Sequence, residues 1–271
     1  MTPTDFNFIS SFLKATTGLT LTPDKTYLLE SRLQPIARKM GILTVSELID
    51  KLRSSRDTAL GKQIAEAMTT NETFFFRDGK PFDHLRDVAL PQLMARRRSE
   101  KKLRIWCAAA STGQEPYSIA MILQDRAQEL AGWRVEIIGT DISEAALDRA
   151  RRGVYSQFEV QRGLPIQLLV KHFRKEAEYW VINQNLRSMV DYRAFNLLGD
   201  LSALGRFDIV FCRNVLIYFD PPTKSKILDG IARALPNDGV LYLGGAETVL
   251  GISQKLELQP NARGVYQTTV A

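Results

Sequence analysis

The sequence predicts an α/β domain built on a parallel sheet and preceded by a small helical domain. Two observations lead to this prediction. From Leu103 onward, short apolar runs alternate with helical patterns, which is typical of parallel strands joined by right-handed crossovers. In residues 1–70 the apolar residues recur only at helical spacing. We therefore expect a helical domain at 1–70, a linker and connecting helix at 71–102, and an α/β domain at 103–271.

Composition places the chain among globular proteins. It has 271 residues, of which 45% are hydrophobic and 24% charged, enough to bury a sizeable core. Because no apolar stretch approaches transmembrane length and the N-terminus lacks the basic start of a signal peptide, we expect a cytoplasmic protein without membrane insertion. The net charge of +6 favours an anionic partner, which could be nucleic acid, a membrane or an acidic protein.

The helical domain is predicted from three apolar stripes. They cover Phe8–Leu13, Leu29–Ile36 and Val45–Leu52, and Thr44 to Glu47 has the spacing of a capping box that opens the third helix. Basic side chains on the outer faces could meet an acidic helical partner, although an ordinary solvated face is an equal alternative. These residues are Arg32, Arg38, Lys39, Lys51, Arg53 and Arg56.

The linker contains three consecutive aromatic residues, Phe74–Phe76. They do not fit an amphipathic period, so we expect this segment to pack against a large, partly polar surface, as a lid over a cofactor would. A helix is predicted from Pro81 to Arg98, with Pro91 restarting it.

The stretch Leu103–Tyr117 reads as strand, tight loop and helix. Small residues in the loop and Pro116 near the helix start let a ligand approach the helix N-terminus. The next strand, 135–140, ends at Asp141, where a nucleotide-binding α/β unit holds a ribose diol. Since the loop keeps only Gly113 and has no phosphate-cradling glycines or Walker lysine, a phosphate-free nucleoside is favoured, and S-adenosylmethionine is the obvious candidate.

The remaining elements follow from periodicity. The alternation breaks after the helix at 144–152, and a short helix and a hairpin around an Asn-rich turn indicate a small inserted antiparallel β-subdomain at about 174–190. The predicted elements after the first loop are helices 116–130, 144–152, 165–173 and 221–235, the hairpin 179–190, and strands 135–140, 190–194, 207–212 and 240–243. With only two cysteines, Cys107 and Cys212, and two histidines, we expect buried free thiols and no metal site.

Five motifs together resemble the CheR family of chemotaxis receptor methyltransferases, over essentially the whole chain. They are Thr70–Arg77, Gly113–Ser118, Gly139–Asp141, Asn196–Leu197 and Phe211–Phe219. The resemblance implies a class I, Rossmann-like S-adenosylmethionine-dependent methyltransferase domain with an inserted small antiparallel β-subdomain and an N-terminal helical domain. It also implies methyl transfer to glutamate side chains of membrane chemoreceptors, giving glutamate methyl esters for chemotactic adaptation and S-adenosylhomocysteine as product. The sequence departs from the family pattern at Ala109-Ala110, where Gly-Cys is usual, and at Gln114, where Glu is common.

The resemblance also implies roles for single residues. Asp141 would accept bonds from the ribose hydroxyls, and Glu115 would pair with the methionine ammonium. The chemistry of the transfer, rather than the resemblance, makes Arg77 and Tyr218 our candidates for positioning the reacting groups. The cofactor-contacting set is Asn71, Thr73, Arg77, Glu115, Asp141, Asn196, Leu197, Arg213 and Asn214.

Several of these residues also have a plain structural alternative. Asp141 could cap the following helix, Glu115 could be a first-turn acid on the helix dipole, and Tyr218 could be a core aromatic. Asn71 and Thr73 could cap the following turn, and Arg213 and Asn214 could form an ordinary strand-end loop.

The expected partner is the cytoplasmic helical region of methyl-accepting chemoreceptors, reached by a monomeric enzyme through basic helices near Arg53 and Arg56. A nucleic-acid methyltransferase is disfavoured because Arg213-Asn-Val-Leu-Ile-Tyr lacks the Asn/Asp-Pro-Pro-aromatic arrangement, and a noncatalytic receptor-binding module because the site residues are retained. The connection after Phe173 is short and charged, so we expect no tether to a receptor C-terminal peptide.

Overall fold

The computed structural model describes residues 1–55 and 57–269, which form two compact units. One contains Met1–Thr70 with Tyr218–Thr223, and the other Asn71–Ile217 with Lys224–Ala271. Within the described residues no helix combines the length and the apolar character needed to cross a bilayer.

The first unit contains four helices around their own core. They are α1 (Pro3–Thr17), α2 (Thr26–Lys39), α3 (Val45–Ser54) and α4 (Thr58–Met68), with a 3₁₀ turn, η1, at Pro23–Lys25. The core is lined by fully buried Ile9, Leu13, Leu33, Leu48 and Ile64, so the three predicted stripes do face inward. Thr44 caps α3 by accepting the Glu47 N–H, as its spacing predicts.

Not all the basic residues of this unit are free surface charges. Arg32 is half-buried and donates to the main-chain oxygens of Met68 and Thr69, so it holds the end of α4. Arg53 pairs with Asp5 at 3.3 Å and lies over the Phe8 ring. Of the predicted basic residues, Arg38, Lys39, Lys51 and Arg53 are exposed, and Arg56 lies outside the described residues.

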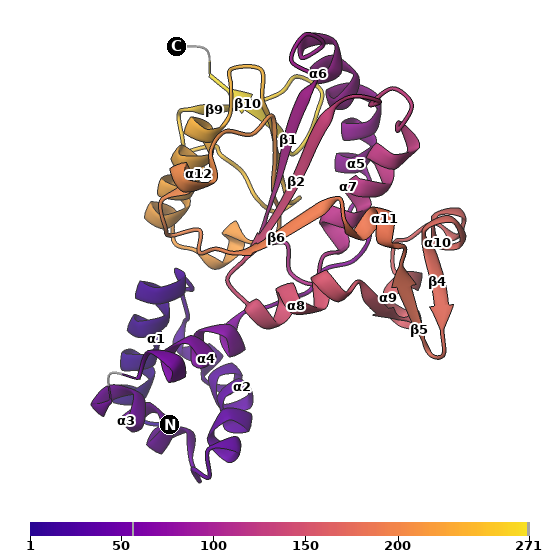
Figure 1. Cartoon of the computed structure of the whole chain (residues 1–271). Coiled ribbons are helices and arrows are strands. Elements are labelled where there is room, and N and C mark those ends of the chain that lie inside the picture. The colour runs from indigo at the N-terminus through magenta and orange to yellow at the C-terminus, as the bar shows by residue number, and fades with distance from the viewer. Residues whose placement is uncertain (56, 270–271) are drawn as a thin grey trace. The chain divides into compact units, whose positions relative to one another are not determined.

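The second unit is built on a seven-stranded sheet with the order β6-β2-β1-β7-β8-β10-β9. The strands β6, β2, β1, β7 and β8 are parallel, and β10 runs antiparallel to β8 and β9 (Figure 1). Their bounds are β1 Lys102–Ala108, β2 Arg134–Asp141, β6 Val190–Ala194, β7 Ile209–Cys212, β8 Val240–Leu243, β9 Leu256–Leu258 and β10 Val265–Thr268. Neither β9 nor β10 was predicted from the sequence.

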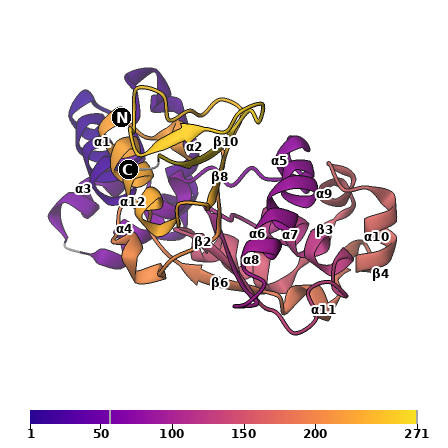
Figure 2. The same cartoon turned by 90° about the horizontal axis from the view of Figure 1, so that it is seen from above.

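Helices cover both faces of this sheet. In Figures 1 and 2, α6 and α7 lie on one side of β1 and β2, and α12 lies on the other side. The predicted helix at 81–98 is α5 (Lys80–His84), a π turn η2 (Leu85–Ala89) and α6 (Leu90–Arg96) in succession, so Pro91 does fall near a helix start. The other helices are α7 (Gln114–Asp125), α8 (Glu144–Arg152) and α12 (Pro221–Ala234), with 3₁₀ turns η3 (Leu201–Leu204) and η4 (Leu216–Tyr218).

A second, three-stranded antiparallel sheet has the order β3-β5-β4 and is named the β-subdomain here. It is formed by β3 (Val154–Ser156), β4 (Phe173–Glu176) and β5 (Tyr179–Ile182), with α9 (Gln157–Gln161) and α10 (Ile166–His172) between β3 and β4. The predicted hairpin was therefore misplaced: its turn lies at Ala177, where φ is 51°, and the Asn-rich stretch opens α11 (Gln184–Arg187).

The aromatic linker packs into this second unit. Phe75 is fully buried, with its ring edge-on to Tyr155 at 5.1 Å and to Phe173 at 5.6 Å between ring centroids. The main-chain oxygen of Phe75 would lie 2.1 Å from any Cβ at Gly163, so only glycine permits this approach. The prediction that this segment packs against a large surface is confirmed, and the surface includes the β-subdomain.

Candidate functional site

The carboxyl ends of β1, β2 and β7 meet at the point where the strand order reverses. From β1 the sheet continues to β2 and β6 on one side and to β7 and β8 on the other. In open α/β sheets, ligands bind in the crevice outside the carboxyl ends of the strands at such a point. Most of the predicted site residues lie on the segments that leave these strand ends.

The loop from β1 to α7 has an unusual backbone. Ala109, Ser111 and Gly113 all have positive φ, at 61°, 52° and 95°. A Cβ on Gly113 would lie 2.7 Å from the Tyr192 hydroxyl, so glycine is required by both conformation and space. The loop thus leads directly into the N-terminus of α7, which starts at Gln114.

Asp141, at the end of β2, organises the loops around it. Its carboxylate accepts the N–H of Ser111 at 2.8 Å and the N–H of Ser143 at 2.9 Å, and the residue is only 6% exposed. Ser143 caps α8, so the alternative of Asp141 as the helix cap is wrong. The main-chain oxygen of Asp141 accepts from Phe195, which brings the following Asn196 and Leu197 beside the same strand end.

A buried arginine joins β7 to α7. Arg213 has a side chain only 1% exposed and donates to Glu115 at 2.9 Å and to Asp78 at 2.7 Å. It also donates to the main-chain oxygen of Arg77 at 2.7 Å, while its buried Nε has no partner among the described residues. Burial raises the pKa of the Glu115 carboxyl, and the positive charge of Arg213 opposes that rise. Glu115 is therefore a member of a buried ion-pair network, and it also lies in the first turn of α7, as its structural alternative predicted.

The linker segment is attached to the same region. The Asn71 main-chain oxygen accepts a bond from the Ser111 hydroxyl at 2.9 Å, and the Arg77 guanidinium donates to the main-chain oxygen of Glu72. Thr73 is half-buried between them in sequence. The structure thus brings the segment carrying Asn71, Thr73 and Arg77 to the β1 loop and to Arg213.

Two acidic residues of this region were not identified from sequence. Asp78 is the second carboxylate on Arg213. Glu247, on the loop after β8, accepts the N–H of Asn214 at 2.8 Å. Neither belongs to a recognisable local pattern, because each meets its partner from a distant part of the chain.

Whereas the residues above belong to the second compact unit, Tyr218 belongs to the first. There its main-chain oxygen accepts a hydrogen bond from Thr20 N at 3.0 Å. The side chain is half-buried, and its catalytic role stays a prediction.

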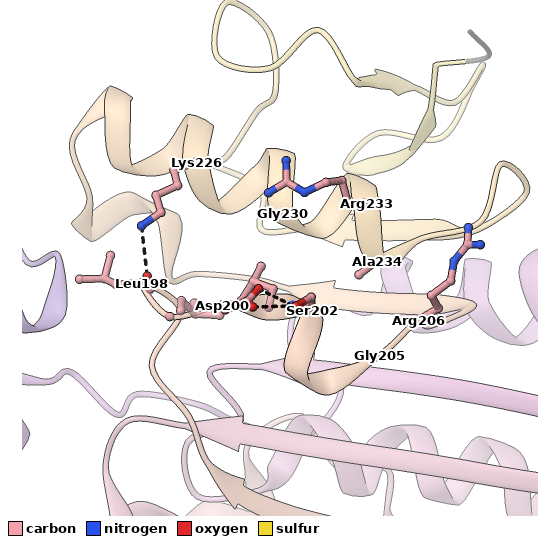
Figure 3. A pocket seen from close by; sticks show the side chains of 12 residues that line it. Leu198, Asp200, Ser202, Gly205, Arg206, Lys226, Gly230, Arg233 and Ala234 are labelled. Carbon is pink, nitrogen blue, oxygen red and sulfur yellow. Dashed lines mark hydrogen bonds between the residues drawn. The ribbon is translucent and has the colours of Figure 1, made fainter.

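A pocket of 470 Å³ adjoins the site at Leu197, between the segment that follows β6 and α12. In Figure 3, Lys226 points to the main-chain oxygen of Leu198, and Asp200 bonds Ser202 on the opposite wall. Arg206 and Arg233 also line it, which makes the pocket mainly cationic. Glu115, Asp141 and Arg213 are not among its lining residues.

The cysteines are structural. Cys107 and Cys212 are fully buried, and burial raises the pKa of both thiols. Across residues 1–55 and 57–269, no cluster of three or more His, Cys, Asp or Glu side chains could hold a metal ion.

Comparison with known proteins gives matches over both parts of the chain. The model of the CheR methyltransferase all-alpha domain matches residues 4–69, and that of the CheR methyltransferase SAM binding domain matches residues 71–265. The chain is 37% identical to the chemotaxis protein methyltransferase Cher2 of Pseudomonas putida, over 97% of both chains. It is 40% identical to chemotaxis protein methyltransferase 1 of Vibrio cholerae, over 91% of this chain and 90% of that protein.

Proposed function

Because this chain belongs to the CheR methyltransferase family, we propose that it transfers the methyl group of S-adenosylmethionine to glutamate side chains of chemoreceptors. Its relatives are named chemotaxis protein methyltransferases, which supports a role in chemotaxis. The observation that carries the proposal is that the buried Glu115–Arg213 pair and the buried carboxylate of Asp141 lie on segments that leave the carboxyl ends of adjacent strands.

The donor and acceptor groups of the site suit this cofactor. Asp141 is an acceptor for two ribose hydroxyls, and Glu115, whose bond to Arg213 uses only Oε2, is an acceptor for the methionine ammonium. Asn196 and Leu197 follow β6 beside Asp141, where they would face the nucleoside. When bound, S-adenosylmethionine supplies an electrophilic methyl group on a sulfonium.

The acceptor needs little acid–base help. A glutamate carboxylate has an ordinary pKa near ~4.3, so it is already the anionic nucleophile at neutral pH. Its oxygen forms the new bond to the methyl carbon while the carbon–sulfur bond breaks and its electron pair goes to sulfur. The protein gains most by aligning the two groups and removing water from the carboxylate. Arg77 would attract and position that carboxylate, and Tyr218 would orient it.

The cofactor assignment is tested by substituting Asp141 with Ala or Asn. Losing charged hydrogen bonds should weaken S-adenosylhomocysteine binding by about 1–3 kcal/mol, measured by calorimetry. Asp148→Ala, on the exposed face of α8, is the matched control and should bind as the wild type does. Unchanged affinity in a folded Asp141→Asn protein would remove Asp141 from the cofactor site.

The chemistry of transfer is tested with labelled cofactor and isolated receptor membranes. A glutamate methyl ester is hydrolysed by mild base and releases labelled methanol, whereas a methyl group on nitrogen stays on the protein. Base-stable label on the receptors would contradict the proposed carboxylate acceptor.

For receptor recognition we propose the basic helices near Arg53, whose exposed side chains include Arg38, Lys39, Lys51 and Arg53. In the β-subdomain, β4 and β5 are joined only by Ala177 and Glu178, so no long loop is present to close over an added peptide strand. Charge reversal at Arg38 and Lys39 should weaken receptor methylation strongly at low salt, while reversal at Arg98 and Lys101 should not. Micromolar binding of receptor C-terminal pentapeptides at β5 would instead establish a tethered mode.

A further inference from the structure

Glu247 is a buried carboxylate with an unusual set of partners. It lies on the loop after β8 and is 9% exposed. Its Oε1 accepts the N–H groups of Val215 and Leu216, at 2.9 and 2.7 Å. Its Oε2 accepts those of Asn214 and Gly244, at 2.8 and 2.7 Å. All four bonds come from the main chain.

Three of these donors belong to consecutive residues that follow β7. Successive N–H groups that converge on one anion form a concave anion-binding nest. The nest begins at Asn214, which has φ 58°, a left-handed conformation that asparagine adopts more readily than most other non-glycine residues. Glu247 is the group on which the N–H groups of this turn converge.

The end of β8 is shaped to admit this carboxylate. A Cβ added to Gly244 would lie 2.7 Å from Glu247 Oε2 and 2.8 Å from Asn214 Nδ2. Only glycine permits the two loops to approach so closely. The Glu247 side chain therefore joins the end of β7 to the end of β8. The join lies directly after Arg213, whose guanidinium donates to Glu115.

We propose that Glu247 is a positioning residue for methyl transfer, which holds the turn at Arg213 and Asn214 in the shape that presents these two residues to the cofactor. The inference rests on the cofactor contacts of the proposed function. Glu247 itself touches main-chain donors and need not touch the cofactor, so its removal acts through the turn.

The surroundings of Glu247 permit a sharp test. One wall of a 550 Å³ cavity is formed by Gly244 and Glu247, and Lys80 and Arg263 also line it. A small carboxylate such as acetate could enter this cavity and occupy the nest vacated by Glu247→Ala. Acetamide has nearly the same size but carries no charge and presents N–H groups where the nest requires acceptors.

The experiment measures the dissociation constant of S-adenosylhomocysteine for the full chain by calorimetry, in acetate, acetamide or chloride at equal ionic strength. Glu247→Ala should weaken binding by roughly tenfold or more, since charged hydrogen bonds are lost, and acetate should restore much of it while acetamide does not. Glu247→Gln should also weaken binding, because its amide group meets two N–H donors, and it should not respond to acetate. Glu257→Ala, on the exposed edge strand β9, is the control.

Wild-type binding and turnover in Glu247→Gln would overturn the proposal, as would a Glu247→Ala protein that folds and gains nothing from acetate. The same titration separates this failure from that of the proposed function. If the wild type and Glu257→Ala bind S-adenosylhomocysteine, the cofactor assignment stands whatever the Glu247 variants do.

Discussion

Replacing Glu115 with Ala should destabilise the second unit as well as cofactor binding. Arg213 is 1% exposed and would lose one of its two carboxylates. A hydrogen bond to a charged group contributes about 1.5–3 kcal/mol, and leaving a buried charge without its partner costs about 3–5 kcal/mol. The upper figure is a limit here, because Asp78 and the Arg77 main-chain oxygen remain on the guanidinium. We expect a loss of about 2–4 kcal/mol in the free energy of unfolding.

Tryptophan fluorescence during urea unfolding is the suitable assay. All three tryptophans, Trp106, Trp133 and Trp180, lie in the second unit, so the signal reports on the part of the molecule that contains the pair. Glu129→Ala is the control, because it breaks only an exposed pair with Arg126 and should cost less than about 1 kcal/mol. Equal stabilities of the two variants would refute the reasoning that Arg213 depends on Glu115.

Three further results are expected. Gly113→Ala would put a Cβ 2.7 Å from the Tyr192 hydroxyl at φ 95°, so it should cost about 1–3 kcal/mol in unfolding free energy and weaken cofactor binding; a normal melting temperature would contradict this. Hydrogen bonds from Lys14 and Thr223 lower the pKa of Asp220 to about 2. The stabilisation of the folded state by these bonds is therefore present at pH values above the ordinary aspartate pKa and is lost as the pH falls through about 2. Carboxyl NMR of Lys14→Met should show Asp220 titrating closer to its ordinary pKa, and an unchanged titration would exclude the pair. Tyr218→Phe should lower turnover far more than cofactor affinity, whereas wild-type turnover would make Tyr218 a packing residue.

The parts of the fold that were predictable are those with strong local patterns. The strand, loop and helix around Gly113 could be predicted because small residues and Pro116 interrupt an apolar run. The position of β2 could be predicted because its apolar run ends at Asp141. The parallel order then places both strand ends at one edge of the sheet. Local spacing thus predicted that these strand ends lie at one edge of the sheet, and the resemblance alone named the residues that would contact a cofactor there.

The errors arose where partners are distant in sequence. The strand β3 has only three residues and becomes a strand by pairing with β5, more than twenty positions later. The misplaced hairpin followed from reading Asn183 and Asn185 as a turn, although Asn183 instead precedes a short helix. Glu247 could not be recognised for the same reason, since all its donors except Gly244 come from the loop after β7.

The burial of Phe75 against Tyr155 and Phe173 has a thermodynamic consequence. Phe75 shares a short segment with Asn71, Thr73 and Arg77, while its two ring partners belong to the β-subdomain. If the cofactor contacts this segment as proposed, the free energy of ordering the segment is shared with the β-subdomain. Thermodynamic linkage makes such a coupling reciprocal. A partner that orders β3–β5 would then raise the affinity for the cofactor by the same factor by which the cofactor raises the affinity for the partner. Hydrogen exchange in β4 and β5 should accordingly slow when S-adenosylhomocysteine is added, and in Phe75→Leu the two events should become independent.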